Sequence, residues 1–415
     1  MRHKNSQGIA YSVFPFGSSR QMFLVGEPEE QYTCQDKPDY PKQVRNLLEN
    51  VKNVCEEQGF TENVAGMCHF FIADIGMKEL VRQLIHEVFD KEAPEISFLG
   101  AVTFVPQAPA NGAVIALELW VISAEKHPLN CDRDYSERTS MIEFDEMQWS
   151  FTGVEQGRTS CTSAYSRAYN AFVLMQRYFN DYDSTLDHLL RTWIYQGHLL
   201  QPEGETQRYK ELNRARTDFF GKTRFLQDYL PKGYKGRAYP ASTGIGADDF
   251  DVVISAVALD TKRKDVIAVP LENPHQTSAF DYGEMYGPQS PKFSRAMAVA
   301  VDKTCLIFVS GTASITDSES QHIGDPVKQT EQTLDNISVL IDGDNLSRHG
   351  ISNVACGLGN LECVRVYIKR PSDLPLIRQV CERRLSANVP TLYTIADICR
   401  PELLVEIEGI ALANR

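Results

Sequence analysis

The sequence has no block of basic residues and no run of apolar residues long enough to span a membrane. Its 415 residues carry 42 Lys and Arg against 55 Asp and Glu, which gives a formal charge of −13. Nucleic-acid affinity rests largely on clustered Lys and Arg, so the acidic balance argues against a nucleic-acid partner. A membrane helix needs about 20 consecutive apolar residues, so we expect no membrane partner either. Any anionic ligand must then be held by a few local cations.

Closely spaced cysteine pairs are also missing. The 10 Cys are scattered, and several lie in apolar runs such as residues 304–306. None has zinc-ligand spacing, which favours reduced and mostly buried thiols. No glycine-rich phosphate loop is present. No apolar signal core follows residues 1–10, so we expect a cytoplasmic protein. A hydrophobic content of 42% with 23% charged residues is typical of a globular chain of two or three domains.

One pattern occurs three times: an opening strand that ends at a glycine, a helix, a strand, a second helix and a closing strand. The opening strands end at Gly26, Gly153 and Gly311. The spans from these glycines to the matching position of the closing strand are 92 residues to Glu118, 100 to Val253 and 95 to Glu406. The helices are apolar on one face and the closing strands are rich in β-branched residues. The sequence therefore predicts an α+β fold in which two helices cover the mixed sheet of each unit.

We expect the units to be residues 1–126, 139–271 and 285–415. The first join, residues 127–138, is a charged linker. The second, residues 272–291, is rich in proline, glycine and aromatic side chains. Exposing its apolar and aromatic residues to water would be costly. We interpret the second join as an ordered loop that lines a cleft, and the residues behind this interpretation are Phe280, Tyr282, Met285 and Tyr286.

Several motifs of the third unit resemble the RidA/YjgF family: residues 310–315, 324–325, 329–330, 336–337 and 404–411. The first unit resembles a diverged copy, with Gly26, Gln43, residues 73–75 and residues 116–118. Proteins of this family have a chorismate-mutase-like fold and assemble as trimers with ligand sites between subunits. The resemblance implies a covalent pseudo-trimer with clefts between its units. A covalent trimer can stay a monomer or form a homo-oligomer, and the sequence leaves both open.

A second resemblance covers roughly the last half of the chain and is to the chorismatases, which cleave chorismate and share this fold. The matching segments, in order, are residues 190–195, 207–210, 213–216, 240–246, 272–276, 286–291, 293–296, 310–315, 319–320 with 322, and 396–400. The resemblance implies a hydrolase or lyase that needs no metal or redox cofactor and acts on a small anionic cyclic substrate. The products would be pyruvate and either a dihydrodiol or a hydroxybenzoate, formed in a cleft between the second and third units.

The chain departs from the chorismatase pattern at four positions. It has Lys210, His275 and Lys369 where arginine is usual, and Ile194 where asparagine is usual. Replacing arginine removes a bidentate fork and so changes carboxylate recognition. Two alternatives therefore stay open: a RidA-like enzyme with a different small substrate, and a non-catalytic metabolite-binding sensor.

The acid for enol-ether cleavage is Glu406 by this resemblance. Such cleavage needs a proton donor for the enol carbon. Glu406 and Glu408 alternate along the last strand and so point to one face of the sheet. A carboxyl in an apolar cleft has its pKa raised by desolvation, which keeps its proton available near neutral pH. Glu408 fits better as an ordinary polar-face residue.

The candidate substrate-binding residues are cations and polar side chains of the second and third units. Arg191 lies in a strongly apolar strand, where an unpaired charge is costly, so it is either ion-paired or awaiting an anionic ligand, and we favour the ligand. Arg208 opens a helix, where a positive charge gains nothing from the helix dipole. By the resemblance, Ala313 and Cys399 track the type of product. The full set is Arg191, Arg208, Tyr195, Tyr209, Gln276, Arg295, Ala313, Lys369 and Cys399.

Overall fold

The structure is a computed structural model of the chain. It describes residues 2–4, 8–28, 33–34, 37–61, 64–89, 100–123, 138–155, 163–249, 251–283 and 286–414. Of the charged linker at residues 127–138, only Arg138 is among them. Met285 of the second join also lies outside the described residues.

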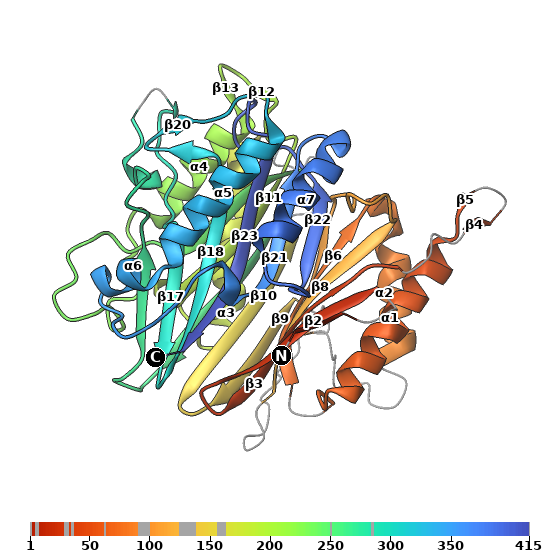
Figure 1. Ribbon diagram of the computed structural model, residues 1–415, viewed down its shortest axis with the longest axis horizontal. Helices are drawn as coiled ribbons and strands as arrows, with labels where there is room; N and C mark the ends of the chain where they lie inside the picture. The colour runs from red at the N-terminus through yellow and green to blue at the C-terminus, as the bar shows by residue number, and fades with distance from the viewer. Residues whose placement is uncertain are drawn as a thin grey trace.

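The first large sheet, sheet 1, consists of β1 (Arg2–Lys4), β2 (Ile9–Phe16), β3 (Ser19–Gly26), β8 (Ile115–Ser123), β6 (Val64–Ile72) and β7 (Ala101–Val105), in that spatial order. Only the β6–β7 ladder is parallel among these pairs. The helices α1 (Tyr40–Glu57) and α2 (Lys78–Phe89) cover one face of the sheet (Figure 1). Helix α1 begins where the Asp39 side chain accepts a hydrogen bond from the Lys42 amide.

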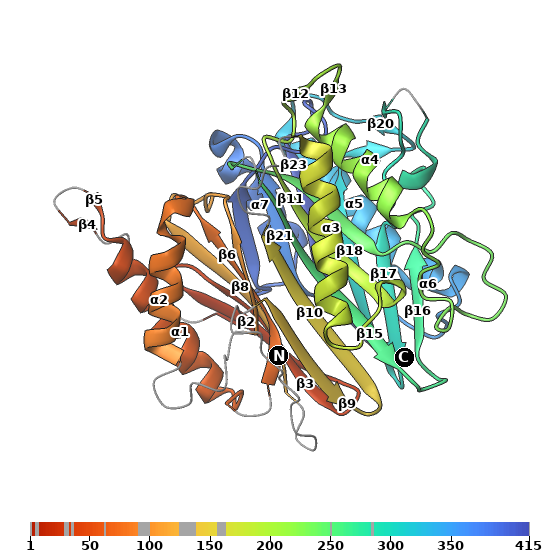
Figure 2. The ribbon, with the colours of Figure 1, turned by 180° about the vertical axis from the view of Figure 1, so that it is seen from behind.

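Sheet 2 has the order β14 (Ala241–Ala247), β11 (Leu189–Gly197), β15 (Val252–Thr261), β10 (Met147–Glu155) and β9 (Thr139–Phe144). Its helices are α3 (Ala164–Asn180) and α4 (Arg208–Phe220), which face the viewer in Figure 2. The buried face of α3 repeats at helical spacing, with Ala168, Ala171, Phe172 and Met175 turned toward the sheet.

Sheet 3 has the order β16 (Ile267–Leu271), β17 (Ala296–Val301), β18 (Thr304–Ala313), β23 (Val405–Asn414), β21 (Leu361–Ile368) and β22 (Thr391–Ile395). It is covered by α5 (Pro326–Ile341), α6 (Gly343–Arg348) and α7 (Leu374–Arg384), in blue shades in Figure 1. The edge strand β16 follows sheet 2 in the chain but pairs with β17.

Three two-stranded ribbons complete the fold: β4 (Thr33–Cys34) with β5 (Lys37–Pro38), β12 (Pro202–Glu203) with β13 (Thr206–Gln207), and β19 (Ile315–Thr316) with β20 (Glu319–Ser320). In each large sheet a hairpin strand pairs with the closing strand, the closing strand pairs with a middle strand, and the middle strand pairs in parallel with an edge strand. The predicted α+β fold with three repeated, helix-covered sheets is confirmed.

The inner faces of the three sheets meet in one apolar core. The Trp120 ring of sheet 1 lies 5.1 Å from Phe151 of sheet 2 and 5.6 Å from Phe308 of sheet 3, measured between ring centroids. The core also contains Trp149 and Phe16, which form an edge-to-face pair at 5.9 Å. Large aromatic side chains bury much apolar area, so this contact joins the three sheets strongly. Of the seven free thiols in the described residues, five are buried.

The strand registers show which residues of the three closing strands correspond to one another, and they change one of the predicted correspondences. The last ladder pairs of the middle and closing strands are Ile72–Ile115, Gln196–Val252 and Ile368–Val405. One residue further along each closing strand lie Ala116, Val253 and Glu406. The structural counterpart of Glu406 in sheet 1 is therefore Ala116, and Glu118 corresponds to Glu408. No helix among the described residues is both long and apolar enough to cross a bilayer.

Candidate active site

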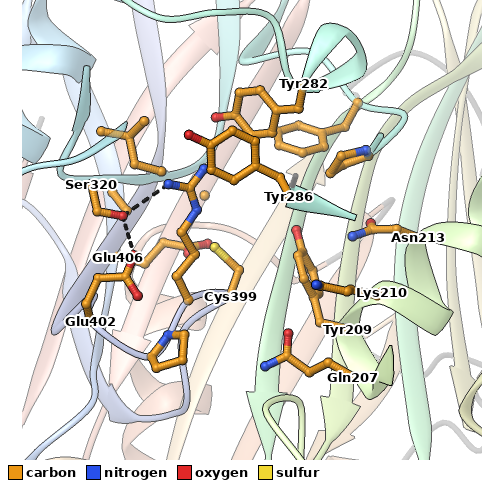
Figure 3. A pocket seen from close by; sticks show the side chains of 18 of the residues that line it. Gln207, Tyr209, Lys210, Asn213, Tyr282, Tyr286, Ser320, Cys399, Glu402 and Glu406 are labelled. Atoms are coloured by element: carbon orange, nitrogen blue, oxygen red, sulfur yellow. Dashed lines mark hydrogen bonds between the residues drawn. The ribbon is translucent and has the colours of Figure 1, made fainter. Parts of the chain in front are cut away.

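A cavity of about 610 Å³ lies where sheet 2 meets sheet 3. One wall comes from α4 and β14, and the opposite wall from β18, β23 and the segment 399–402 that precedes β23. The loop that contains Tyr282 and Tyr286 covers a third side (Figure 3). Both tyrosines belong to the second join, which we predicted to line a cleft.

Glu406 lies at the inner end of this cavity and is only 4% exposed. Among the described residues, none donates a hydrogen bond to its carboxyl group. Burial, and after it the nearby Glu408 carboxylate, raise the pKa of Glu406 to about 8 against the opposing charges of Arg191 and Arg295. At neutral pH the side chain therefore holds a proton that it can donate.

Gly311 makes room for the Glu406 carboxyl group. It lies at a register shift of the β18–β23 ladder, between Val309 and Thr312. A Cβ atom on Gly311 would lie 2.0 Å from Oε1 of Glu406 and 3.0 Å from Cγ2 of Thr243. A side chain here would therefore displace the carboxyl group, so the absence of a Cβ at Gly311 leaves space for the Glu406 side chain in its present position.

Two arginines line the cavity, and each has a buried nitrogen without a hydrogen-bond partner among the described residues. Arg295 donates through Nη2 to the Tyr282 hydroxyl at 2.6 Å, and its unpartnered nitrogen within the described part of the chain is Nε. Arg400 donates through Nη1 to Ser320 Oγ at 3.1 Å, and the nitrogen for which the described residues offer no partner is Nη2. The Tyr282 ring lies 5.6 Å from each guanidinium carbon. Unpaired buried donors are costly, so both arginines are suited to a carboxylate ligand.

The α4 wall presents polar groups opposite the arginines. Tyr209, Lys210 and Asn213 line the cavity and lie across from Glu406 and Cys399 in Figure 3. Behind them the buried Arg216 donates to Asn213 Oδ1 at 2.6 Å and leaves its Nε without a partner. Burial raises the pKa of the Tyr209 hydroxyl, which therefore stays a neutral hydrogen-bonding group. The cavity can thus hold a small molecule between cations on one side and hydroxyl, amide and ammonium groups on the other.

A search of protein-family models finds no match to this chain. The 3-hydroxybenzoate synthase of Streptomyces hygroscopicus is 32% identical over 301 residues, which are 71% of this chain and 81% of the relative. The chain belongs to the chorismatase family. A chorismatase of Streptomyces rapamycinicus is 34% identical over 226 residues, or 54% of this chain and 63% of that protein. A chorismatase crystal structure shares the fold, with a TM-score of 0.60, 24% identity and coverage of 74% of this chain and 86% of that one.

Five of the ten predicted site residues of this chorismatase-family chain line the cavity: Glu406, Tyr209, Arg295, Ala313 and Cys399. Ala313 is the ladder partner of Glu406 across β18 and β23. Burial raises the pKa of the Cys399 thiol to about 12, so the thiol is neutral and behaves as a small apolar group.

The other five predicted residues lie behind the cavity walls. Gln276 donates to the Ile315 carbonyl at 2.9 Å, and Lys369 donates to the Pro401 carbonyl at 2.6 Å. Arg208 donates to the Gly197 carbonyl at 2.8 Å and pairs with Glu203. These three thus hold segments next to the cavity. Tyr195 and Arg191 lie in a buried ionic cluster between the sheets, where Tyr195 accepts a hydrogen bond from Arg365 at 2.7 Å.

Arg191 is ion-paired in the structure. Its Nη2 lies 2.6 Å from Glu408 and donates also to Thr243 Oγ1 at 2.6 Å. The sequence left two alternatives for Arg191, an ion pair or an anionic ligand, and we favoured the ligand. The structure contains the ion pair. Of the four departures from the chorismatase pattern, Lys210 is among the residues that line the cavity.

Sequence reasoning did not select Arg400, Asn213 or Ser320 as site residues, although all three line the cavity. Arg400 follows Cys399 directly and lies in a segment that carries the chorismatase resemblance. Its position next to Cys399 was the sequence signal that could have identified it as a site residue. The described residues contain no group of three or more His, Cys, Asp or Glu placed to hold a metal ion.

Proposed function

We propose that this protein cleaves chorismate, with Glu406 as the proton donor, and releases pyruvate and a ring product. Chorismate carries two carboxylates and an enol ether. Glu406 donates its proton to the terminal methylene carbon of the enol ether, and the adjacent carbon becomes an oxocarbenium centre. Water or a hydroxyl of the substrate ring then attacks that centre, and the bond to the ring oxygen breaks.

The atoms balance for both product types. Attack by water consumes one water molecule and gives pyruvate and a dihydrodiol. Attack by a ring hydroxyl followed by aromatisation gives pyruvate and a hydroxybenzoate without net consumption of water. In both routes the methyl group of pyruvate contains one hydrogen that came from Glu406.

The observation that carries this proposal is the contrast between Glu406 and its surroundings. A buried carboxyl group that receives no hydrogen bond from the described part of the chain faces a cavity whose wall holds Arg295 and Arg400. An acid that keeps its proton, placed within reach of cations for a dianion, is the arrangement that enol-ether protonation requires. We assign one substrate carboxylate to Arg295 and Arg400 and the other to Lys210 and Asn213.

The first test is pyruvate release from chorismate, followed by a coupled lactate dehydrogenase assay. We expect turnover by the wild-type protein and a loss of at least a hundredfold in Glu406→Gln, because a positioned acid contributes about 10²–10⁴-fold. Binding of chorismate to Glu406→Gln, measured by calorimetry, should persist. Equal rates for the two proteins would contradict the role of Glu406, and binding without pyruvate from either would favour a sensor.

An isotope measurement separates the routes. In D₂O, one solvent deuterium should enter the methyl group of pyruvate, because the Glu406 proton exchanges with solvent. In H₂¹⁸O, with pyruvate reduced to lactate as it forms so that its carbonyl oxygen does not exchange with solvent, label should appear in the lactate hydroxyl if water attacks the oxocarbenium carbon. Mass spectrometry of the ring product then distinguishes the dihydrodiol from the hydroxybenzoate.

A further inference from the structure

Two carboxylates occupy the same face of β23 two residues apart, and their surroundings are opposite. Glu406 faces the cavity and receives no hydrogen bond from the described residues. Glu408, 3% exposed, points into the buried region between the sheets. A pair of acidic groups in such different surroundings can divide two tasks, one carrying a proton and the other a charge.

Glu408 is surrounded by donors from two sheets. Arg191 Nη2 lies 2.6 Å and Arg365 Nη1 2.9 Å from its oxygens. Trp193 Nε1 and the Tyr367 hydroxyl each donate at 3.0 Å, and Thr243 also donates to it. Charged and neutral donors together fix the position of the carboxylate and satisfy its charged form.

Thr243 connects this carboxylate to the strand segment beside the acid. Its Oγ1 donates to Glu408 and accepts from the Gly311 amide at 2.8 Å. Gly311 in turn lies directly against the Glu406 carboxyl group. Glu408 therefore has a fixed position relative to Glu406, through both the shared strand and the Thr243 bridge.

We propose that Glu408 is a positioning residue for the reaction at Glu406, where its fixed negative charge favours the proton-bearing form of the acid. This inference rests on the proposed function for its catalytic meaning. Two like charges close together in a buried region repel, so a carboxylate held at Glu408 opposes ionisation of Glu406.

The remaining groups that face Glu406 set the balance of charge. Arg191 on β11 and Arg295 before β17 favour its ionised form, whereas burial and Glu408 oppose it. Tyr209 on α4, Cys399 before β23 and Tyr367 on β21 are neutral at pH 7 because burial raises their pKa values. The net result is a pKa of about 8 for Glu406.

Sheet 1 contributes to this balance through Arg365. The guanidinium group of Arg365 donates through Nε and Nη2 to Glu118 and through Nη1 to Tyr367 and Tyr195. Its charge is therefore shared between Glu118 and Glu408, so that Glu408 is not neutralised by Arg365 alone. By sharing Arg365, Glu118 of sheet 1 thus helps to preserve the negative charge of Glu408 that acts on Glu406.

The test is the pH dependence of kcat/KM for pyruvate release in two variants of opposite sign. A required acid makes the rate fall as pH rises through its pKa. For Glu408→Gln we expect the alkaline limb to move down by about one pH unit, and for Arg191→Gln we expect it to move up by a similar amount. At pH 9 the first variant should be about tenfold slower than wild type.

The control matches the change in charge. Glu382→Gln removes an exposed charge on α7 and should keep the alkaline limb of the wild-type protein. Unchanged limbs in folded Glu408→Gln and Arg191→Gln would overturn the proposal, as would shifts of the same direction. If Glu408→Gln fails to fold, the upward shift of Arg191→Gln remains the required result.

A direct titration keeps this inference separate from the proposed function. Carbon-13 carboxyl resonances of Glu-labelled protein, assigned to Glu406 by comparison with Glu406→Gln, report its pKa without any turnover. A downward shift of that pKa in Glu408→Gln together with no pyruvate from chorismate would reject the function and keep the electrostatic coupling. Pyruvate release from chorismate together with an unchanged pKa of Glu406 in Glu408→Gln would keep the proposed function and reject the electrostatic coupling.

Discussion

At the scale of single residues, the raised pKa that suits Glu406 to the proposed role of proton donor also lowers the stability of the folded protein. Its folded pKa of about 8 lies above the ordinary value of 4.5. Between these two values the folded state binds more protons than the unfolded state, so the stability contributed by protonated Glu406 falls as pH rises through that window. Active sites commonly hold such costly groups because their function depends on them.

We therefore predict that Glu406→Gln is more stable than the wild-type protein at pH 7. Gln cannot ionise, so the difference should reach about 3 kcal/mol at pH 7 and disappear near pH 4, where both states of the wild type are protonated. Thermal or urea unfolding at a series of pH values measures it. A variant that is equally stable at all pH values would contradict the raised pKa, and the exposed substitution Glu382→Gln serves as the control.

At the scale of strands, period-two alternation predicted correctly that Glu406 and Glu408 share a face. Alternation could not assign them different partners, because Arg191 is 217 residues from Glu408 in the sequence. Counting from the glycines matched Val253 with Glu406, as the ladders do, but selected Glu118 in place of Ala116 in sheet 1. Sheets 2 and 3 contain register shifts in the ladders between the middle and closing strands, between Leu189 and Arg191 and between Leu361 and Cys363, whereas the corresponding ladder of sheet 1 is continuous. One inserted residue at a bulge changes the count without a signal in composition.

Sequence reasoning identified some of the residues that line the cavity and missed others, and the difference has a physical reason. Aromatic residues of the second join were selected because their exposure to water is costly, and Glu406 was selected by the resemblance to the chorismatases. Arg400 gave no such signal, since an arginine in a loop is usually solvated. Its importance depends on its unpaired Nη2 and its stacking 4.4 Å from Tyr286, which arise only in the fold.

The pair between Glu118 on β8 and Arg365 on β21 joins sheets 1 and 3. Burial acts to raise the pKa of Glu118, but Arg365 and His69 outweigh it and bring it to about 2. The stability that this pair contributes is therefore present above the ordinary pKa of 4.5 and is lost as pH falls toward 2. Removing one partner of a buried pair leaves the other charge uncompensated.

We predict that Glu118→Gln destabilises the protein by about 3–5 kcal/mol at pH 7. The matched control is Glu79→Gln on α2, whose carboxylate is 77% exposed and pairs with Arg82 on the same helix. That substitution should cost about 0–1 kcal/mol. Urea unfolding at pH 7 compares them, and similar midpoints for the two variants would show that the Glu118–Arg365 pair does not stabilise the contact between sheets.

At the scale of the whole molecule, three repeated sheets produce three corners, and the corners differ. The positions that correspond to Glu406 hold Ala116 in sheet 1 and Val253 in sheet 2. Where sheet 2 meets sheet 1, a Cβ on Gly153 would lie 2.5 Å from Thr103 Oγ1 and 3.0 Å from the Val102 carbonyl, so β10 and β7 are in close contact at this point.

Backbone hydrogen bonds join sheets 1 and 3 at their corner. The Ala110 amide donates to the Tyr393 carbonyl, and the Ile395 amide donates to the Ala108 carbonyl, both at 2.9 Å. The three repeated units therefore share one core. Of the three corresponding positions, the one in sheet 3 holds a glutamate, Glu406, and it lies at the corner between sheets 2 and 3. The other two corners serve to join the sheets, in line with the aromatic contacts at the centre.

We accordingly predict one chorismate site per chain. Isothermal titration of Glu406→Gln, which binds without turnover, should give a stoichiometry near one, because the positions that correspond to Glu406 in the other two corners hold the apolar residues Ala116 and Val253. Arg295→Ala in the same background should weaken this binding by roughly tenfold or more, since a charge-assisted hydrogen bond contributes about 1.5–3 kcal/mol. Two or three equivalents bound per chain would show that another corner also binds the ligand, and binding unaffected by Arg295→Ala would place the ligand outside the cavity at Glu406.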